Sequence, residues 1–177
     1  IPKEKKAAIP AGHLIPRKGI FDFLQIASEM PDTVFIWFGG GNWWAVPQEV
    51  KRAVRRKTEN VIFAGYVERR DLKDAYCGAD AFLFCSQEET EGIVVLEALS
   101  CGIPVIVRRI PVYEGWLREN VHVFKAAGVK EFRSRLESIC AGRCLDLTAA
   151  GRKLAEEHSL FLTGMRLNEI YQLEELS

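Results

Sequence analysis

Two carboxylates, Glu89 and Glu97, lie in the segment SQEETEGIVVLEALSCGIPVI with seven residues between them. A loop ending in Glu91-Gly92 is followed there by an apolar run, which predicts a helix beginning at about Ile93. Backbone N–H groups at the start of a helix lack partners and carry the positive end of the helix dipole, so they attract phosphate. Glu97, about one turn further on, would repel phosphate but can accept hydrogen bonds from the vicinal hydroxyls of a ribose. The segment therefore predicts a site for a nucleotide or a nucleotide-sugar.

Two adjacent cations, Arg17 and Lys18, precede a second predicted helix that runs from Gly19 to Met30. Cations are electrostatically unfavourable at a helix start. An anionic ligand between this pair and the predicted helix start at Ile93 would remove the conflict. We interpret the pair as a modest indication of a diphosphate, against the alternative of solvated surface cations.

Strands and helices are predicted to alternate along the chain, which is typical of an α/β fold with a parallel sheet. We expect about six strands flanked by helices in a Rossmann-like arrangement. The predicted strands are 7–12, 33–38, 60–64, 79–85, 104–107 and 120–124. The predicted helices are 19–30, one starting at Pro47, 71–77, 93–100, 129–140, 145–157 and 162–176, with a short one at 111–117.

Ligands of such sheets bind at the carboxyl ends of the strands, near the switch point of the strand order. Three features follow predicted strands: the Arg17-Lys18 pair, the run Gly39–Gly41, and the loop of Glu89. We expect these three segments to converge at one edge of the sheet.

Several other functions lack support in the sequence. The 24 acidic and 24 basic residues balance, which argues against a nucleic-acid partner, and the basic cluster 52–57 is interpreted as a solvated helix face.

The triple glycine is followed by Asn-Trp-Trp, without dinucleotide-binding spacing, and no P-loop or GxSxG motif occurs. Glu88, Glu89 and Glu91 crowd one loop, but no Asp or His joins them at ligand spacing, so no metal is expected. The five cysteines form no CxxC and favour a reducing cytoplasm.

The run GYVERRDLKDAYCGADAFLFCSQEETEGIVVLEALSCGIPVIV resembles the nucleotide-sugar half of retaining GT-B glycosyltransferases of group 1. EETEGIVVLEAL, the WFG strand end and IPVYEGWL are more narrowly similar to bacterial diacylglycerol glucosyltransferases. The resemblance implies that residues 1–177 form one donor-binding domain, the C-terminal half of a GT-B fold. This domain would end in helices at about 145–177, and an N-terminal acceptor domain would lie outside the chain.

The resemblance also implies roles for individual residues. Glu97 would hold the ribose hydroxyls, and Glu89 would bind hydroxyls of the donor sugar. Backbone N–H groups at the helix start would face the diphosphate and the sugar, two cations would neutralise the leaving diphosphate, and backbone after the third strand would contact uracil. The catalytic positions are Arg17, Lys18 and Glu89, and the donor-binding positions are Gly65, Tyr66, Val67, Glu89, Gly92, Ile93, Val94 and Glu97.

Two positions depart from the family pattern. His13 stands where the broad family often has arginine, so Arg17 is expected to substitute for that cation. Arg108-Arg109 stands where the lipid branch usually has Arg-Asp. The departures concern detail of the donor and acceptor sites rather than the fold.

The resemblance implies transfer of a sugar, most simply glucose from UDP-glucose, to a lipid acceptor such as diacylglycerol, with retention of configuration and without a metal or cofactor. Such an enzyme is expected to be cytoplasmic and peripheral at the inner face of the plasma membrane. Two alternatives stay open: a glycosyltransferase of capsule, teichoic acid or lipopolysaccharide synthesis, and a non-catalytic nucleotide-sugar-binding module.

Overall fold

A computed structural model describes residues 4–174 of the chain, in which strands and helices alternate. The predicted end of the last helix, Leu176, lies outside the described residues. The strands are β1 (Lys6–Ile9), β2 (Thr33–Phe38), β3 (Val61–Gly65), β4 (Ala81–Phe84), β5 (Val105–Arg108) and β6 (Phe124–Ala126). The helices are α1 (Ile20–Ser28), α2 (Gln48–Arg55), α3 (Arg69–Gly78), α4 (Ile93–Ser100), α5 (Val129–Cys140), α6 (Thr148–Glu157) and α7 (Leu160–Glu174). Short 3-10 turns are η1 (Pro16–Lys18), η2 (Trp43–Ala45) and η3 (Pro111–Tyr113).

The strands form one parallel six-stranded sheet in the order β3-β2-β1-β4-β5-β6. The strand order reverses between β1 and β4, where Ala8 pairs with Ala81 and Ile9 with Phe82. The predicted Rossmann-like α/β sheet is confirmed. In this order, the crevice beyond the carboxyl ends of β1 and β4 is the switch point at which ligands bind.

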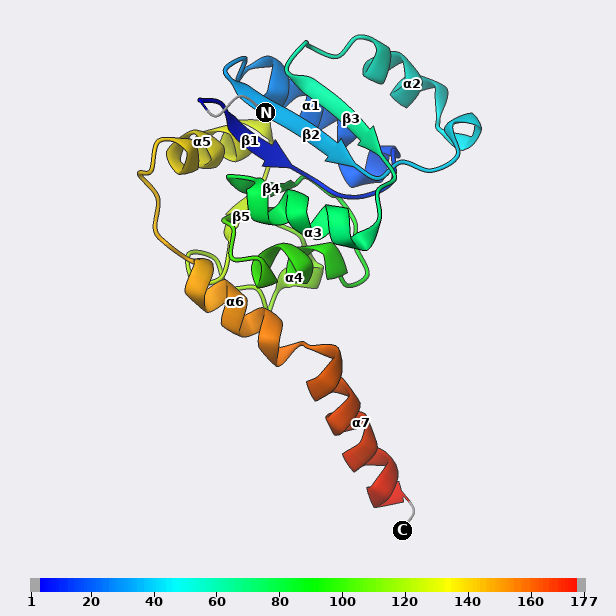
Figure 1. The fold of residues 1–177 in the computed structure, drawn as a ribbon, viewed down its shortest axis with the longest axis vertical. Helices are drawn as coiled ribbons and strands as arrows, with labels where there is room; N and C mark the ends of the chain where they lie inside the picture. The colour runs from blue at the N-terminus through cyan, green and yellow to red at the C-terminus, as the bar shows by residue number, and fades with distance from the viewer. Residues whose placement is uncertain (1–3, 175–177) are drawn as a thin grey trace.

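Helices cover both faces of the sheet (Figure 1). Neighbouring strand residues point to opposite faces, so Ala8 packs with α1 and α5, whereas Ile9 packs with α3 and α4. Both faces are buried, which explains why strands such as TVFIWF are continuously apolar.

Two predicted strands differ from the observed ones. The first strand ends at Ile9 rather than Gly12, because Pro10 has no N–H to donate to the ladder, and only an isolated bridge from Ala11 to Phe38 follows. The sixth strand was predicted at 120–124 but runs from Phe124 to Ala126. Residues before it form a turn in which Asn120 has a positive φ of 56° and its N–H donates to Val123 O.

The helix α7 extends away from the body of the molecule toward the C-terminus (Figure 1). It carries exposed apolar side chains, including Leu160, Phe161, Ile170 and Tyr171. No helix within residues 4–174 combines the length and the apolar character needed to cross a bilayer.

Candidate functional site

The loops after β1 and β4 are joined directly across the switch point of the sheet. The N–H of Gln87 donates to Arg17 O over 2.7 Å, and the Ser86 hydroxyl donates to the same oxygen over 3.2 Å. Gly19, with a φ of +77°, packs so closely that a Cβ there would lie 2.1 Å from Cys85 O. Only glycine permits this approach, which brings the residues before α1 against those after β4.

A buried ion pair joins the two loops. Lys18 Nζ lies 2.5 Å from Glu89 Oε1, and the two side chains are only 14% and 7% exposed. Lys18 Nζ also lies 5.7 Å from the centre of the Phe84 ring. Arg17 is placed differently: it is exposed, and its Nη1 lies 3.4 Å from Glu88 O. The structure thus brings both predicted cations to the loop of Glu89, one buried and paired and the other facing solvent.

The start of α4 is set by Gly92, whose φ of +81° is a left-handed conformation. A Cβ on Gly92 would lie 2.9 Å from the Tyr113 hydroxyl, which is fully buried and has no hydrogen-bond partner among the described residues. Burial, and secondarily the charge of Glu89, raise the pKa of Tyr113. The phenol therefore stays protonated and holds an unused donor behind the helix start.

Glu97 lies one turn into α4, on the same helix face as Ile93, four residues earlier, which is exposed. The Tyr76 hydroxyl of α3 donates to Glu97 Oε2 over 3.2 Å. Burial, and then the charge of Glu97, raise the pKa of Tyr76, so the phenol acts as a donor. This bond orients one carboxylate oxygen and leaves the other available to a ligand.

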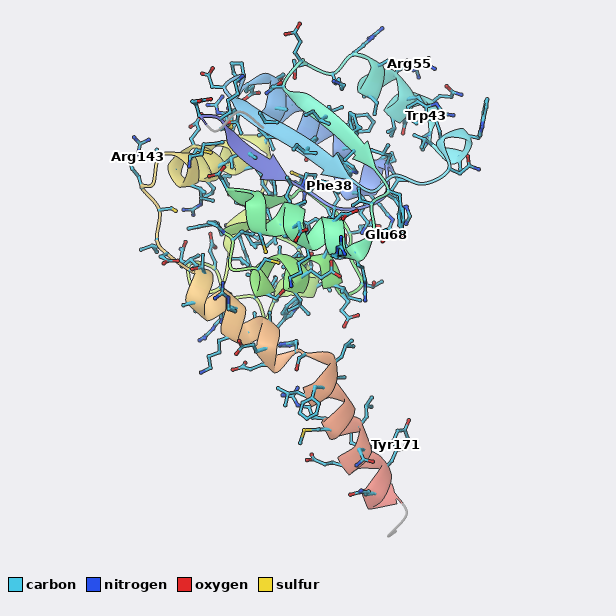
Figure 2. All side chains as sticks on the ribbon, viewed as in Figure 1. Phe38, Trp43, Arg55, Glu68, Arg143 and Tyr171 are labelled. Carbon is cyan, nitrogen blue, oxygen red and sulfur yellow. The ribbon has the colours of Figure 1, made fainter. Side chains whose placement is uncertain are left out.

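The carboxyl ends of β1, β2 and β3 surround a hollow of about 550 Å³. The N–H of Gly39 donates to Gly65 O over 2.7 Å, and a Cβ on Gly39 would lie 2.5 Å from Gly12 O. In Figure 2, Phe38 at the end of β2 and Glu68 just beyond β3 lie at this edge of the sheet. The lining residues are Gly12, His13, Leu14, Gly39, Gly40, Gly41, Trp43, Val54, Phe63, Gly65 and Tyr66.

The three expected features do meet along this edge. Gly39 contacts Gly12, a Cβ on Gly12 would lie 3.8 Å from the Lys18 side chain, and Lys18 pairs with Glu89. Val67, by contrast, is half-buried and is not among the residues that line the hollow. Glu97 contacts Tyr76 rather than the Lys18–Glu89 pair.

The structure shows what His13 and Arg109 contact, at the two positions that depart from the family pattern. His13 Nδ1 lies 3.0 Å from Gly40 O and so ties the first loop to the glycine run. Arg109, which is half-exposed, donates to both carboxylate oxygens of Glu119, over 2.7 and 3.3 Å. Sequence reasoning missed Tyr76 and Tyr113. Tyr113 lies inside the IPVYEGWL motif that carried the resemblance, whereas no sequence signal marked Tyr76.

The family is shown by comparison with known proteins. A family model described as glycosyl transferases group 1 matches residues 1–154. The chain therefore belongs to the group 1 glycosyltransferases.

Among curated relatives, the chain is 39% identical over 168 residues to the processive diacylglycerol alpha-glucosyltransferase of Acholeplasma laidlawii, covering 95% of this chain and 51% of that protein. It is 30% identical over 156 residues to the alpha-galactosylglucosyldiacylglycerol synthase of Streptococcus pneumoniae (strain ATCC BAA-255 / R6), covering 85% of this chain and 41% of the relative. The chain thus spans about half the length, or less, of these relatives.

Solved structures support the fold. The sucrose-phosphate synthase of Thermosynechococcus elongatus matches with a TM-score of 0.89 at 20% identity, over 100% of this chain and 47% of that one. Anabaena Alr3699/HepE, solved in complex with UDP-glucose, matches with a TM-score of 0.83 at 16% identity, over 95% of this chain and 49% of that one. The predicted Rossmann-like fold of GT-B glycosyltransferases is confirmed.

Proposed function

We propose that the chain supplies the donor site of an enzyme that transfers glucose from UDP-glucose to a lipid acceptor such as diacylglycerol, with retention of configuration. The observation that carries this proposal is the Lys18–Glu89 pair, which crosses the switch point beside the start of α4. Cation, carboxylate and free helix N–H groups there suit a ligand that is part diphosphate and part sugar. The glycolipid-synthase relatives favour a lipid acceptor.

In the proposed reaction, the bond from the sugar C1 to the diphosphate oxygen breaks, the acceptor hydroxyl oxygen bonds to C1, and the hydroxyl proton passes to the departing diphosphate. Negative charge develops on the departing diphosphate. Lys18 has three N–H donors, so it can hold Glu89 and a phosphate oxygen at the same time. Arg17 and the N–H groups of Gly92, Ile93 and Val94 add further positive potential, which is electrostatic stabilisation of a leaving group.

The remaining residues bind the rest of the donor. We propose that Glu89 accepts hydrogen bonds from sugar hydroxyls and that Glu97 accepts them from the ribose. The backbone of Gly65, Tyr66 and Val67 is proposed to contact uracil, and Gly65 and Tyr66 line the hollow at this edge. Protein cations supply the positive charge in this scheme, so the transfer is proposed to need no metal.

Glu97→Ala is expected to weaken UDP binding about 10- to 100-fold, because hydrogen bonds to a charged group contribute about 1.5–3 kcal/mol. Isothermal titration calorimetry with UDP measures this. Glu88→Ala is the matched control, since Glu88 is an exposed carboxylate of the same segment. A second variant, Tyr76→Phe, removes only the hydrogen bond that orients Glu97 and keeps the carboxylate. Equal affinity of Glu97→Ala and wild type would refute the ribose assignment.

The 177-residue chain alone is expected to bind UDP but not to transfer sugar, because the acceptor site is proposed to lie on an N-terminal domain that the chain does not contain. Incubation with labelled UDP-glucose and diacylglycerol, followed by lipid extraction, measures transfer. Labelled glycolipid formed by the chain alone would contradict this assignment of the acceptor site.

The enzyme is proposed to work as a peripheral protein at the cytoplasmic face of the plasma membrane, where its lipid acceptor is found. Transfer to another acceptor, in capsule, teichoic acid or lipopolysaccharide synthesis, is the second candidate. An assay of the longer enzyme with diacylglycerol and with soluble acceptors distinguishes the two.

A further inference from the structure

Two adjacent tryptophans project from the loop after β2, on the turn η2. The side chain of Trp44 is 86% exposed and that of Trp43 is 39% exposed. The turn is held firmly: Asn42 Oδ1 accepts from the N–H of Trp44 over 3.0 Å, and Lys51 Nζ donates to Trp44 O over 3.3 Å. Lys51 Nζ also lies 5.8 Å from the centre of the Trp43 ring. These contacts present the apolar rings to the outside.

The neighbouring helix α2 adds positive charge. The segment 48–59 contains five cations and two acids, a local excess of three in a chain whose total charge balances. Arg52, Arg55 and Arg56 are exposed, and within residues 4–174 none of them forms an ion pair. Arg52 and Arg56 border a shallow hollow of about 310 Å³.

The tryptophans and the arginines lie at the same end of the molecule. Figure 2 shows Trp43 and Arg55 together there, far from Tyr171 of α7 and opposite Arg143. We call Trp43, Trp44, Arg52, Arg55 and Arg56 the Trp-Arg surface. Trp43 also lines the hollow at the carboxyl edge, so this surface borders the candidate donor site.

We infer that the Trp-Arg surface docks onto an anionic lipid bilayer. Tryptophan favours the membrane–water interface because its ring is apolar and its N–H can stay hydrated. Arginines without acidic partners are complementary to anionic headgroups, and each cation near such a surface contributes measurably to binding. A protein partner that covered these rings would have to supply acids for the arginines, whereas an anionic bilayer provides the apolar and the charged element together.

Docking through this surface would hold the carboxyl edge of the sheet close to the membrane. This placement is useful for catalysis only if the acceptor is a lipid of that membrane, so this part of the inference rests on the proposed function. The two are nevertheless tested separately, because vesicle binding needs no nucleotide and UDP titration needs no lipid. Loss of one with retention of the other identifies which proposal fails.

The test is co-sedimentation of the 177-residue chain with phosphatidylcholine vesicles that contain or lack phosphatidylglycerol. We expect binding only with phosphatidylglycerol, and weaker binding at high salt. Neutralising Arg52, Arg55 and Arg56 to glutamine is expected to lower the partition coefficient on the order of 100-fold at low ionic strength. The matched control neutralises Lys130, Arg143 and Lys153, which are exposed cations on or beside α5 and α6, and is expected to change binding far less.

Tryptophan fluorescence gives a second readout. Brominated lipids in the anionic vesicles are expected to quench the wild-type emission, and Trp43→Phe/Trp44→Phe is expected to remove most of this quenching. Of the two tryptophans that remain, Trp37 is buried in the core and Trp116 is half-buried against Tyr113 and His158. Circular dichroism verifies that each variant is folded. Absence of vesicle binding, equal binding to neutral vesicles, or an equal loss in the control variant would each overturn the inference.

Discussion

At the residue scale, the Lys18–Glu89 pair is the feature on which both stability and binding depend. Its two charges lie away from water, between the loops that follow β1 and β4. A buried ion pair adds little net stability, but removal of one partner leaves the other charge uncompensated, at a cost of about 3–5 kcal/mol for a fully buried pair. Replacement of one partner is therefore expected to lower the stability of the fold, whereas replacement of both partners together is expected to lower it less.

Lys18→Met is expected to lower the free energy of unfolding by about 2–4 kcal/mol, because Glu89 loses its partner. Lys18→Met/Glu89→Gln is expected to recover most of this loss. UDP binding by the double variant is expected to stay weak, because Lys18, the proposed contact of the diphosphate, is still missing. Urea denaturation and calorimetry on the two variants measure these effects. If the double variant binds UDP like wild type, Lys18 does not contact the diphosphate.

At the element scale, the turn before β6 depends on a buried histidine. The N–H of Arg118 donates to His122 Nδ1 over 3.2 Å, so this nitrogen must be unprotonated. Burial first, and then the charge of Arg118, lower the pKa of His122 below its usual 6.5. The turn replaces the beginning of the predicted sixth strand and sets where β6 enters the sheet.

Because the pKa of His122 is lowered in the folded state, the folded protein is expected to be less stable at lower pH. The unfolded chain binds the proton more readily than the folded one, so stability decreases as the pH falls through the ordinary histidine pKa toward the folded-state value. The loss attributable to one such group is at most about 1.4 kcal/mol per pH unit. His122→Gln is expected to flatten this part of the profile, as measured by urea denaturation at about pH 7.5 and about pH 5.5. Parallel pH profiles of variant and wild type would show that His122 is not responsible.

At the scale of the whole molecule, α7 lies apart from the core. Removal of residues 160–177 is expected to change the free energy of unfolding by less than about 0.5 kcal/mol, because substitutions away from buried contacts have small effects. Leu154→Ala, in the preceding helix α6, is the contrasting control, since Leu154 is buried and its truncation should cost about 2–5 kcal/mol. A large loss of stability on removal of α7 would mean that it packs on the body in solution.

The order of strands and helices and the two buried faces of the sheet follow from the sequence alone, because apolar periodicity and glycine stops are local properties. Strand ends were less predictable: Pro10 ended β1 early, and the turn around Asn120 displaced β6. The apolar pattern continued past the end of β1, whereas it began before the first residue of β6.

The sequence by itself also determined the segment that forms the candidate site, because Glu89, Gly92 and Glu97 are brought into relation by a single loop and helix. Only the tertiary structure decided that Lys18 is buried against Glu89 while its neighbour Arg17 faces solvent. Likewise, only the fold placed the buried hydroxyl of Tyr113 behind Gly92. The physical reason is that these partners come from different elements, so their distances depend on the sheet order and on close packing at Gly19, which no local pattern encodes.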